Sequence, residues 1–240
     1  MSARREHEIP VGTARIHCET FGMGEEAVLF LHGNGSTPRD FDCQYPAFAQ
    51  RYRVITMDSR GQGHSTFGEE AFGLVRIADD IPVVLDALGE TAVHVVGFSD
   101  GGNIGLLLAQ RHPERMKRFV CSGANLYPEG LKPEVLADIW ADYRRQEEQA
   151  AFDEAAVREM RILGLMTDEP QIDPAALANV AVPTLVMAGD RDMIAEEHTR
   201  LIARSLPHSR LCIVPDSSHF TFSDQPEFVN RVMLEFLEEG

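Results

Sequence analysis

The chain has 240 residues, of which 44% are hydrophobic and 25% are charged, a composition typical of a globular protein long enough to bury one sizeable core. Asp and Glu number 38 against 22 Lys and Arg, which gives a net charge of −16. Nucleic acids and anionic membranes bind basic surfaces, so this balance argues against both as partners.

The sequence gives no sign of export or of membrane insertion. Residues 1–8 are polar and lack the apolar segment of a signal peptide. No apolar stretch approaches the roughly 18 residues that span a membrane. We therefore expect a cytoplasmic protein, in which scattered cysteines are small core residues rather than disulfides or zinc ligands. These cysteines are Cys18, Cys43, Cys121 and Cys212.

The first two predicted strands, 8–11 and 14–19, are short, partly polar and separated by Gly12. This pattern favours an antiparallel hairpin at the edge of a sheet. Further along the chain, continuous apolar runs predict strands that are buried on both faces of a parallel sheet. These runs are 28–31, 54–57, 93–96, 119–121, 184–187 and 211–214.

Helix-compatible segments separate the predicted strands. One of them ends near Leu88 and contains Pro82, so we expect either a kink or a start near Asp79 rather than an undisturbed helix from Leu74. The alternation of strands and helices predicts an α/β fold with a mostly parallel, doubly wound sheet. Other helices are predicted at 195–205 and 226–239.

The alternation stops between Ala124 and Val182, where no strand is indicated. Residues 133–149 carry apolar side chains at helical spacing, Asp153 is suited to cap a second helix, and Asp173 is suited to open a third. We therefore expect a small helical cap inserted into the α/β core. The predicted boundaries are 1–124 and 183–240 for the core and 125–182 for the cap.

The most informative motif is Gly97-Phe98-Ser99-Asp100-Gly101-Gly102. It stands between an apolar, β-branched run and a helix-compatible run, where a serine is held on a tight strand-to-helix turn with its hydroxyl exposed. The backbones of strand and helix nearly touch at such a turn, so the flanking positions Gly97 and Gly101 need to be small. We expect Ser99 to be a nucleophile, and the alternative is a plain glycine-rich turn.

A serine hydroxyl needs a base, and the base needs a carboxylate that orients it. Both are expected after Ser99, at the carboxyl ends of later strands. His219 follows the last strand in a small polar loop and is the predicted base. Two aspartates follow the strand 184–187, and we favour Asp192 because it lies further along the loop, whereas Asp190 could bond turn amides.

Acyl transfer also requires two N–H donors for the developing oxyanion. The backbone N–H of Asp100 stands at a helix N-terminus, directly after the predicted nucleophile. The second donor is expected in His32-Gly33-Asn34-Gly35, just after a buried strand, and we choose the N–H of Asn34. The alternative for this loop is a tight turn without a catalytic role.

These motifs resemble those of the α/β-hydrolase fold serine hydrolases over almost the whole chain. The resemblance supports Asp192 as the acid and implies a structural role for Asp58–Ser65. The elbow and Gly123-Ala-Asn125 are most similar to biphenyl hydrolase-like (valacyclovir hydrolase-like) members. A serine nucleophile argues against haloalkane dehalogenase and epoxide hydrolase chemistry. The motifs are the elbow 97–102, His-Gly-x-Gly at 32–35, Asp58–Ser65, Gly189–Asp192 and Ser218-His219.

We expect a cofactor-free serine hydrolase, without a metal, that cleaves a small carboxylic ester or a related acyl compound through an acyl-enzyme. Enol-lactonase, thioesterase and C–C bond hydrolase activities use the same triad and are alternatives. A non-catalytic ligand-binding protein is an alternative of another class, because a fold does not fix a function. The predicted partner is a small molecule, and the sequence does not indicate the oligomeric state.

Substrate contacts are expected from Phe98, Asp100, Trp140 and Tyr143. Trp140 and Tyr143 lie about one turn apart on one predicted helix, so both can face the same side, towards the substrate or into ordinary packing. The carboxylate of Asp100 opposes negative charge beside the nucleophile, and pairing with the α-amino group of an amino-acid ester would compensate for this. The resemblance points to the same substrate class. The alternative is that Asp100 bonds a neighbouring loop or helix N–H and only shapes the elbow.

Overall fold

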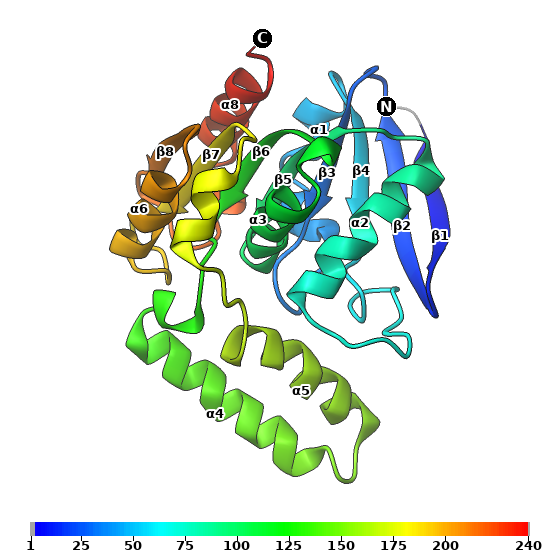
Figure 1. Ribbon diagram of the computed structural model, residues 1–240, viewed down its shortest axis with the longest axis vertical. Coiled ribbons are helices and arrows are strands. Elements are labelled where there is room, and N and C mark those ends of the chain that lie inside the picture. Colours follow the sequence, from blue (N-terminus) through cyan, green and yellow to red (C-terminus); the bar gives the residue numbers. More distant parts are fainter. Residues whose placement is uncertain (1–2, 240) are drawn as a thin grey trace.

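The structure is a computed structural model that describes residues 3–239. Within this range eight strands form one sheet in the order β1-β2-β4-β3-β5-β6-β7-β8 (Figure 1). Strand β2 runs antiparallel to both of its neighbours, and the other neighbouring strands pair in parallel, as predicted. The strands are β1 (Arg5–Val11), β2 (Ala14–Gly22), β3 (Ala27–Leu31), β4 (Arg53–Met57), β5 (Val93–Phe98), β6 (Met116–Ser122), β7 (Thr184–Gly189) and β8 (Ser209–Val214).

Helices cover both faces of the sheet (Figure 1). No helix within residues 3–239 is both long and apolar enough to cross a bilayer. The α-helices are α1 (Tyr45–Phe48), α2 (Leu74–Leu88), α3 (Asp100–Arg111), α4 (Pro133–Gln149), α5 (Glu154–Thr167), α6 (Glu196–Ser205), α7 (Thr221–Asp224) and α8 (Pro226–Leu237). Short 3-10 helices lie at η1 (Pro38–Phe41), η2 (Pro113–Arg115), η3 (Pro128–Gly130) and η4 (Pro174–Asn179).

Side chains of the central strands alternate between two hydrophobic cores, one on each face of the sheet. In β3, Leu29 and Leu31 belong to the core formed with α2, α3 and α6. Val28 and Phe30 belong to the core formed with α1 and α8. A strand that is covered on both faces needs no polar side chains, which is why continuous apolar runs predicted these strands.

Helix α2 begins at Leu74 and continues through Pro82, so the alternative start near Asp79 is wrong. The first turn persists because Leu74 and Ile77 are buried in the core. Burial of two such side chains offsets the loss of the backbone hydrogen bond at a proline, which costs about 3 kcal/mol. The backbone N–H of Leu74 is also satisfied, since it donates a 2.7 Å hydrogen bond to Oε2 of Glu169.

The cap projects from the sheet as a hairpin of α4 and α5 (Figure 1). Asp153 caps α5 as predicted, because its carboxylate accepts a 2.8 Å hydrogen bond from the N–H of Ala155. Asp173 accepts a similar bond of 2.9 Å from the N–H of Ala175. The segment that Asp173 opens is η4, which packs against α3 and α6. The projecting part is therefore formed by α4 and α5.

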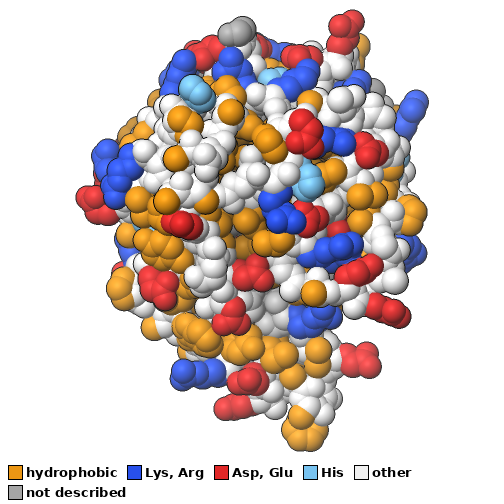
Figure 2. Space-filling view, viewed as in Figure 1, with side chains coloured by type: hydrophobic (Ala, Val, Ile, Leu, Met, Phe, Trp, Pro, Cys, Tyr) orange, Lys and Arg blue, Asp and Glu red, His pale blue; other side chains and the backbone are white. Residues whose placement is uncertain are grey.

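Helix α5 is fixed to the loop that follows β4. Arg158 donates hydrogen bonds of 3.2 Å to the backbone carbonyls of Gly61 and Gly63. The guanidinium of Arg161 lies 3.9 Å from the ring centroid of Phe67, a cation–π contact. In Figure 2, hydrophobic side chains gather across the lower part of the molecule, where Figure 1 shows the cap. Helix α5 therefore joins the cap to the loop that follows β4.

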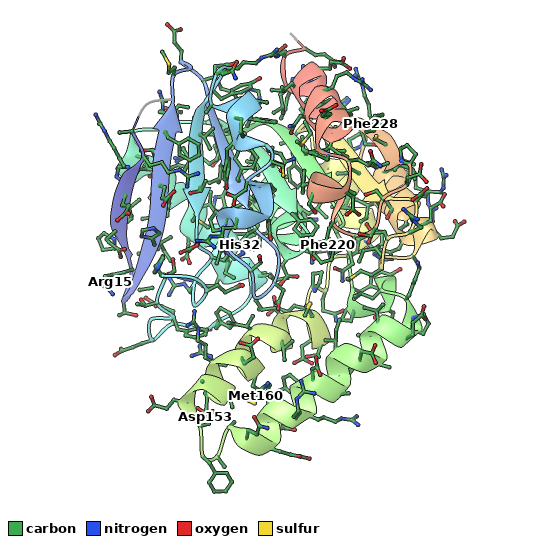
Figure 3. The ribbon with its side chains drawn as sticks, turned by 180° about the vertical axis from the view of Figure 1, so that it is seen from behind. Arg15, His32, Asp153, Met160, Phe220 and Phe228 are labelled. Atoms are coloured by element: carbon green, nitrogen blue, oxygen red, sulfur yellow. The ribbon has the colours of Figure 1, made fainter. Side chains whose placement is uncertain are left out.

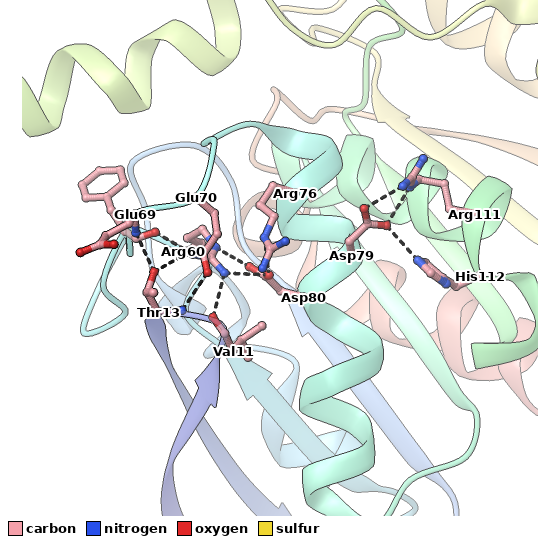
Figure 4. A network of polar contacts seen from close by, with 11 residues as sticks. Val11, Thr13, Arg60, Glu69, Glu70, Arg76, Asp79, Asp80, Arg111 and His112 are labelled. Atoms are coloured by element: carbon pink, nitrogen blue, oxygen red, sulfur yellow. Dashed lines mark hydrogen bonds and ion pairs between the residues drawn. The ribbon is translucent and has the colours of Figure 1, made fainter.

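The loop after β4 is organised around the buried side chain of Arg60 (Figure 4). Arg60 donates to both carboxylate oxygens of Asp80, at 2.7 and 2.9 Å, and to Oε2 of Glu70 at 3.0 Å. The backbone carbonyls of Val11 and Phe67 accept two further N–H groups. A buried guanidinium is tolerated only when it is paired, so this network fixes the β1–β2 hairpin, the loop and α2 relative to one another.

Candidate active site

Ser99 lies between β5 and α3 in a conformation that few non-glycine residues adopt, with φ 54° and ψ −120°. A Cβ atom on Gly97 would lie 2.3 Å from the carbonyl oxygen of Gly101. A Cβ atom on Gly101 would lie 1.9 Å from the carbonyl oxygen of Leu31. Both positions therefore require glycine. The strand and the helix approach each other as the sequence predicted, with the serine at the apex of the turn.

His219 and Asp192 form a buried hydrogen-bonded pair. Nδ1 of His219 donates to Oδ1 of Asp192 over 2.7 Å. The same carboxylate accepts hydrogen bonds from the N–H groups of Ile194, at 3.0 Å, and Gly189, at 3.3 Å. These bonds fix the carboxylate, and the carboxylate orients the imidazole through Nδ1, so that Nε2 is the nitrogen that can accept a proton.

The imidazole of His219 packs beside the elbow that carries Ser99. Its ring centroid lies 4.9 Å from that of Phe98, the residue before Ser99. A Cβ atom on Gly123 would lie 2.7 Å from Cε1 of His219, so the ring occupies the space that a side chain at 123 would fill. The N–H of Ser99 donates to the carbonyl of Ser122 over 2.8 Å. The structure thus places Ser99, His219 and Asp192 at the carboxyl ends of the parallel strands.

Figure 3 shows this end of the sheet from behind and labels two neighbours of the site. His32, which follows β3, and Phe220, which follows His219, both lie at the end of the sheet that faces the cap. The cap therefore stands over the carboxyl ends of the central strands, where ligands of open α/β sheets bind.

Asp190 contacts the loop rather than the imidazole. Its carboxylate accepts hydrogen bonds from the N–H groups of Asp216, at 2.9 Å, and Ser217, at 3.0 Å. These bonds stabilise the charged form and hold the pKa of Asp190 below its usual value. Asp192 therefore contacts the imidazole and Asp190 contacts turn amides, and the role of Asp192 as the catalytic acid stays a prediction.

Asp224 holds the same loop from the other side, a contact that sequence reasoning missed. Its Oδ2 accepts bonds from the backbone N–H of Ser218, at 2.8 Å, and from the Ser218 hydroxyl, at 2.6 Å. The hydroxyl bond is the largest cause of a pKa lowered below the usual value for this group. A single aspartate near the start of a helix does not predict this contact. The contact depends on how α7 packs against the loop that carries Ser218.

The two backbone N–H groups proposed for the oxyanion are those of Asn34 and Asp100. Neither donates a hydrogen bond to another residue within the described part of the chain. The loop that carries Asn34 is held on both sides. The N–H of Gly33 donates to Asp40 at 3.0 Å, and that of Gly35 donates to Gln62 at 2.7 Å. The loop can therefore present an N–H in a fixed position.

The carboxylate of Asp100 is buried and accepts hydrogen bonds from two side-chain amides. Nδ2 of Asn34 donates at 2.8 Å, and Nδ2 of Asn103 donates at 3.3 Å. Burial raises the pKa of Asp100 to about 6, and the bond from Asn34 opposes this shift. The same Asn34 nitrogen donates to the backbone carbonyl of Ile162 in α5, also at 2.8 Å. Asn34 therefore links the elbow to the cap.

Two further asparagines extend this network away from the elbow. Nδ2 of Asn103 donates to Oδ1 of Asn125 at 3.0 Å, and the N–H of Asn125 donates back to Oδ1 of Asn103 at 2.9 Å. Nδ2 of Asn125 then reaches the carbonyl of Tyr127. A polar side chain in the apolar run of α3 was the available signal for Asn103, and our sequence reasoning did not use it.

The remaining candidates for substrate contact lie in two places. Phe98 is buried against the rings of His219, Phe220 and Phe222. Trp140 and Tyr143 contact each other edge to face, with ring centroids 5.7 Å apart. Within residues 3–239, neither cap ring forms a hydrogen bond or ring contact with Ser99 or His219. Their role in binding substrate stays a prediction.

Comparisons with known proteins identify the family of this fold. Residues 26–166 match the sequence profile of a family described as alpha/beta hydrolase fold. The mouse (Mus musculus) protein named Serine hydrolase BPHL is 27% identical over 96% of this chain and 86% of its own length. The pimeloyl-(acyl-carrier protein) methyl ester esterase of Yersinia enterocolitica is 24% identical over 94% of this chain and 98% of its own. The solved structure of Est816, described as an N-acyl homoserine lactone degrading enzyme, has a TM-score of 0.81 and 25% identity, and covers 96% of this chain and 100% of that one.

Proposed function

The chain belongs to the alpha/beta hydrolase fold family, and on that premise we propose that this hydrolase cleaves a small carboxylic ester or related acyl compound through a covalent acyl-enzyme. The observation that carries the proposal is the 2.7 Å bond between His219 and Asp192 beside the elbow of Ser99. A nucleophile, a base and a group that orients the base are the minimum set for activating a hydroxyl.

In the proposed reaction, the Ser99 hydroxyl attacks the acyl carbon while Nε2 of His219 accepts its proton. Asp192 keeps the imidazole in the tautomer with the proton on Nδ1 and stabilises the imidazolium that forms. The N–H groups of Asn34 and Asp100 donate to the oxyanion. The imidazolium then protonates the leaving group, and a water activated by the same base releases the acid and restores Ser99.

Two of the relatives support an acyl compound as the substrate. The named relatives act on related bonds, since one is a methyl ester esterase and one degrades a lactone. An ester and a lactone are opened by the same attack on an acyl carbon.

The carboxylate of Asp100 supports an α-amino-acid ester as the preferred substrate. With a pKa of about 6, the group is ionised at neutral pH although it is buried. Within residues 3–239, its side-chain hydrogen-bond donors Asn34 and Asn103 are neutral amides, and no ion pair offsets the charge. An ammonium group close to the scissile bond would supply the missing positive charge in a partly desolvated site.

Two measurements test these assignments. A fluorophosphonate that labels activated serines is expected to modify the wild type and not Ser99→Ala. No labelling of the wild type, in a protein shown to be folded, would favour a non-catalytic binding protein. Rates on an α-amino-acid ester and its des-amino analogue then test Asp100. We expect the wild type to prefer the amino ester and Asp100→Asn to lose most of that preference, and equal wild-type rates would contradict the amino-acid assignment.

A further inference from the structure

A second group of side chains that can bind a metal ion lies away from the proposed active site, at the β2 side of the sheet. His17, Asp58 and His64 each offer a ligand atom, and these atoms lie within 4.8 Å of one another. We propose that these three side chains form a binding site for a divalent transition metal that favours imidazole ligands, Zn²⁺ in particular.

Two of the three ligands stand on a rigid frame. His17 belongs to β2, and Asp58 directly follows β4, its antiparallel neighbour. The N–H of Asp58 donates to the carbonyl of His17 over 3.0 Å, so the two residues continue the ladder as a cross-strand pair. The N–H of His17 is held by the Ser65 hydroxyl at 2.9 Å. The protein therefore sets the spacing of two ligands before any ion arrives.

The third ligand can adjust. Nδ1 of His64 lies 3.4 Å from Oδ2 of Asp58, and the rings of His17 and His64 meet edge to face with centroids 4.9 Å apart. Ligand atoms of a tetrahedral Zn²⁺ site are about 3.4 Å apart, given bonds of about 2.0–2.1 Å. The histidine–aspartate pair already has this separation. The side chain of His64 is 80% exposed, so it is free to turn the remaining distance towards His17.

The cluster also has the surroundings that metal ligands need. Nδ1 of His17 is bonded to Oε1 of Glu8 at 2.8 Å, which leaves Nε2 as the nitrogen available to an ion. A carboxylate on the far nitrogen of a histidine orients the ring and raises its basicity as a ligand. Oδ2 of Asp58 accepts the N–H of His64 at 2.8 Å, so this carboxylate is oriented as well.

Access and charge are suitable for a cation. The three side chains line an open cavity of about 450 Å³, through which water can supply a fourth ligand. Arg4 also lines the cavity, but it is paired with Glu19 at 2.7 Å. Among the residues that line the cavity, the carboxylates of Asp58 and Asp42 therefore outweigh the remaining arginine, Arg39. Two imidazoles favour Zn²⁺ over Mg²⁺ or Ca²⁺, which prefer oxygen ligands.

A bound ion would act as a clamp between the hairpin and the loop after β4. That loop supports the proposed oxyanion loop, since the N–H of Ser59 donates to Nε2 of His32 at 3.0 Å and Gln62 accepts from Gly35. The ion takes no part in the acyl transfer described above. Its effect is expected on stability, and it can be measured independently of hydrolysis.

The experiment titrates the metal-free full chain with Zn²⁺ by calorimetry and follows Tm in parallel. We expect one ion per chain and a rise in Tm. His64→Ala is expected to weaken binding at least tenfold and to abolish the rise, and its exposed position makes loss of folding an implausible explanation. His17→Gln is expected to do the same. Mg²⁺ is expected to give neither effect.

Two controls separate this site from other histidines. His208→Ala changes an exposed histidine elsewhere and is expected to bind as the wild type does. His219→Ala removes the imidazole of the proposed active site and is also expected to keep the ion. Unchanged binding in His64→Ala would overturn the proposal, and so would loss of binding in His219→Ala. Weak binding of several ions that no single variant alters would mean an adventitious ion only.

Discussion

The carboxylate of Asp190 accepts a 3.0 Å hydrogen bond from the backbone N–H of Ser217, just ahead of His219. Asp192 bonds the imidazole itself. Asp192→Asn is therefore expected to lower kcat by about 10⁴, because the ring loses its tautomer and orientation. Asp190→Asn is expected to act mainly on stability, with a much smaller loss of kcat. Steady-state kinetics of both variants, at matched thermal stability, check this, and a larger kinetic loss for Asp190→Asn would reverse the two roles.

Replacing the proposed nucleophile or base removes the acyl-transfer route itself. Ser99→Ala and His219→Ala are each expected to lower kcat on the order of 10⁴-fold or more, and the double variant is expected to lose little beyond either single change. Ester hydrolysis by purified protein, with circular dichroism as the folding control, measures this. Near-normal activity of either folded variant would contradict the assignment, and additive losses would mean that the two residues do not act as a unit.

Burial of Asp100 makes stability depend on pH in a direction opposite to that of a salt-bridged carboxylate. Its folded pKa of about 6 lies above the ordinary 3.8, so between these values the folded state holds a proton that the unfolded state has lost. Stability therefore falls as pH rises through this window. A shift of about two units corresponds to about 3 kcal/mol.

Asp100→Asn removes this titration and leaves only a pH-independent offset. We expect its free energy of unfolding, relative to wild type, to rise by about 2 kcal/mol between pH 4 and pH 7, somewhat less than the full shift because the unfolded carboxyl is already more than half ionised at pH 4. Urea unfolding at a series of pH values measures the difference. Asp138→Asn, at an exposed position on α4, is the matched control and is expected to give a flat difference. A flat difference for Asp100→Asn as well would show that the buried carboxylate is not destabilising.

The network around Arg60 predicts a large loss of stability on a single substitution. Arg60→Met leaves the buried Asp80 without its bidentate partner, and breaking one side of a buried pair costs about 3–5 kcal/mol. Arg111→Met removes an equally short pair with Asp79, but Arg111 is half exposed and the expected cost is about 0–1 kcal/mol. Denaturant unfolding of both variants measures this difference in stability. Figure 4 shows the two ion pairs side by side. Similar costs would indicate that Asp80 finds another partner, such as Arg76.

The predicted role of Trp140 in the cap can be separated from packing. Trp140→Ala is expected to change the relative kcat/KM across a series of esters of increasing acyl length, because a side chain that touches substrate affects long chains more than short ones. Phe152→Ala is the control, since this ring is 92% exposed between α4 and α5. A uniform loss across the series, in step with a lower Tm, would assign Trp140 to packing.

The strands and the elbow were predictable because their causes are local. A strand buried on both faces needs an apolar run such as 28–31, and a backbone crossing needs glycine at 97 and 101. Pro82 shows where local reasoning fails. Its effect on α2 depends on how much of the first turn the core buries, and that quantity is set by strands far away in the chain.

The side-chain contacts of the site were less accessible to sequence reasoning. The order of Ser99, Asp192 and His219 along the chain agreed with their placement, but the contacts of Asn34 and Asp224 did not follow from any spacing. Asn34 was chosen for its backbone N–H, whereas its side chain bonds an acid on α3 and a carbonyl on α5. Such contacts join three segments, and no two of them are adjacent in sequence.

Few substitutions at position 34 would preserve the two hydrogen bonds that the side chain of Asn34 donates. Aspartate would place a second negative charge against Asp100 and the carbonyl of Ile162, and alanine would leave both acceptors unsatisfied. Glutamine would carry the amide one methylene too far. A library that randomises the entrance of the site to change selectivity is therefore best built with residue 34 held as asparagine, and with diversity placed on the facing surface of the cap.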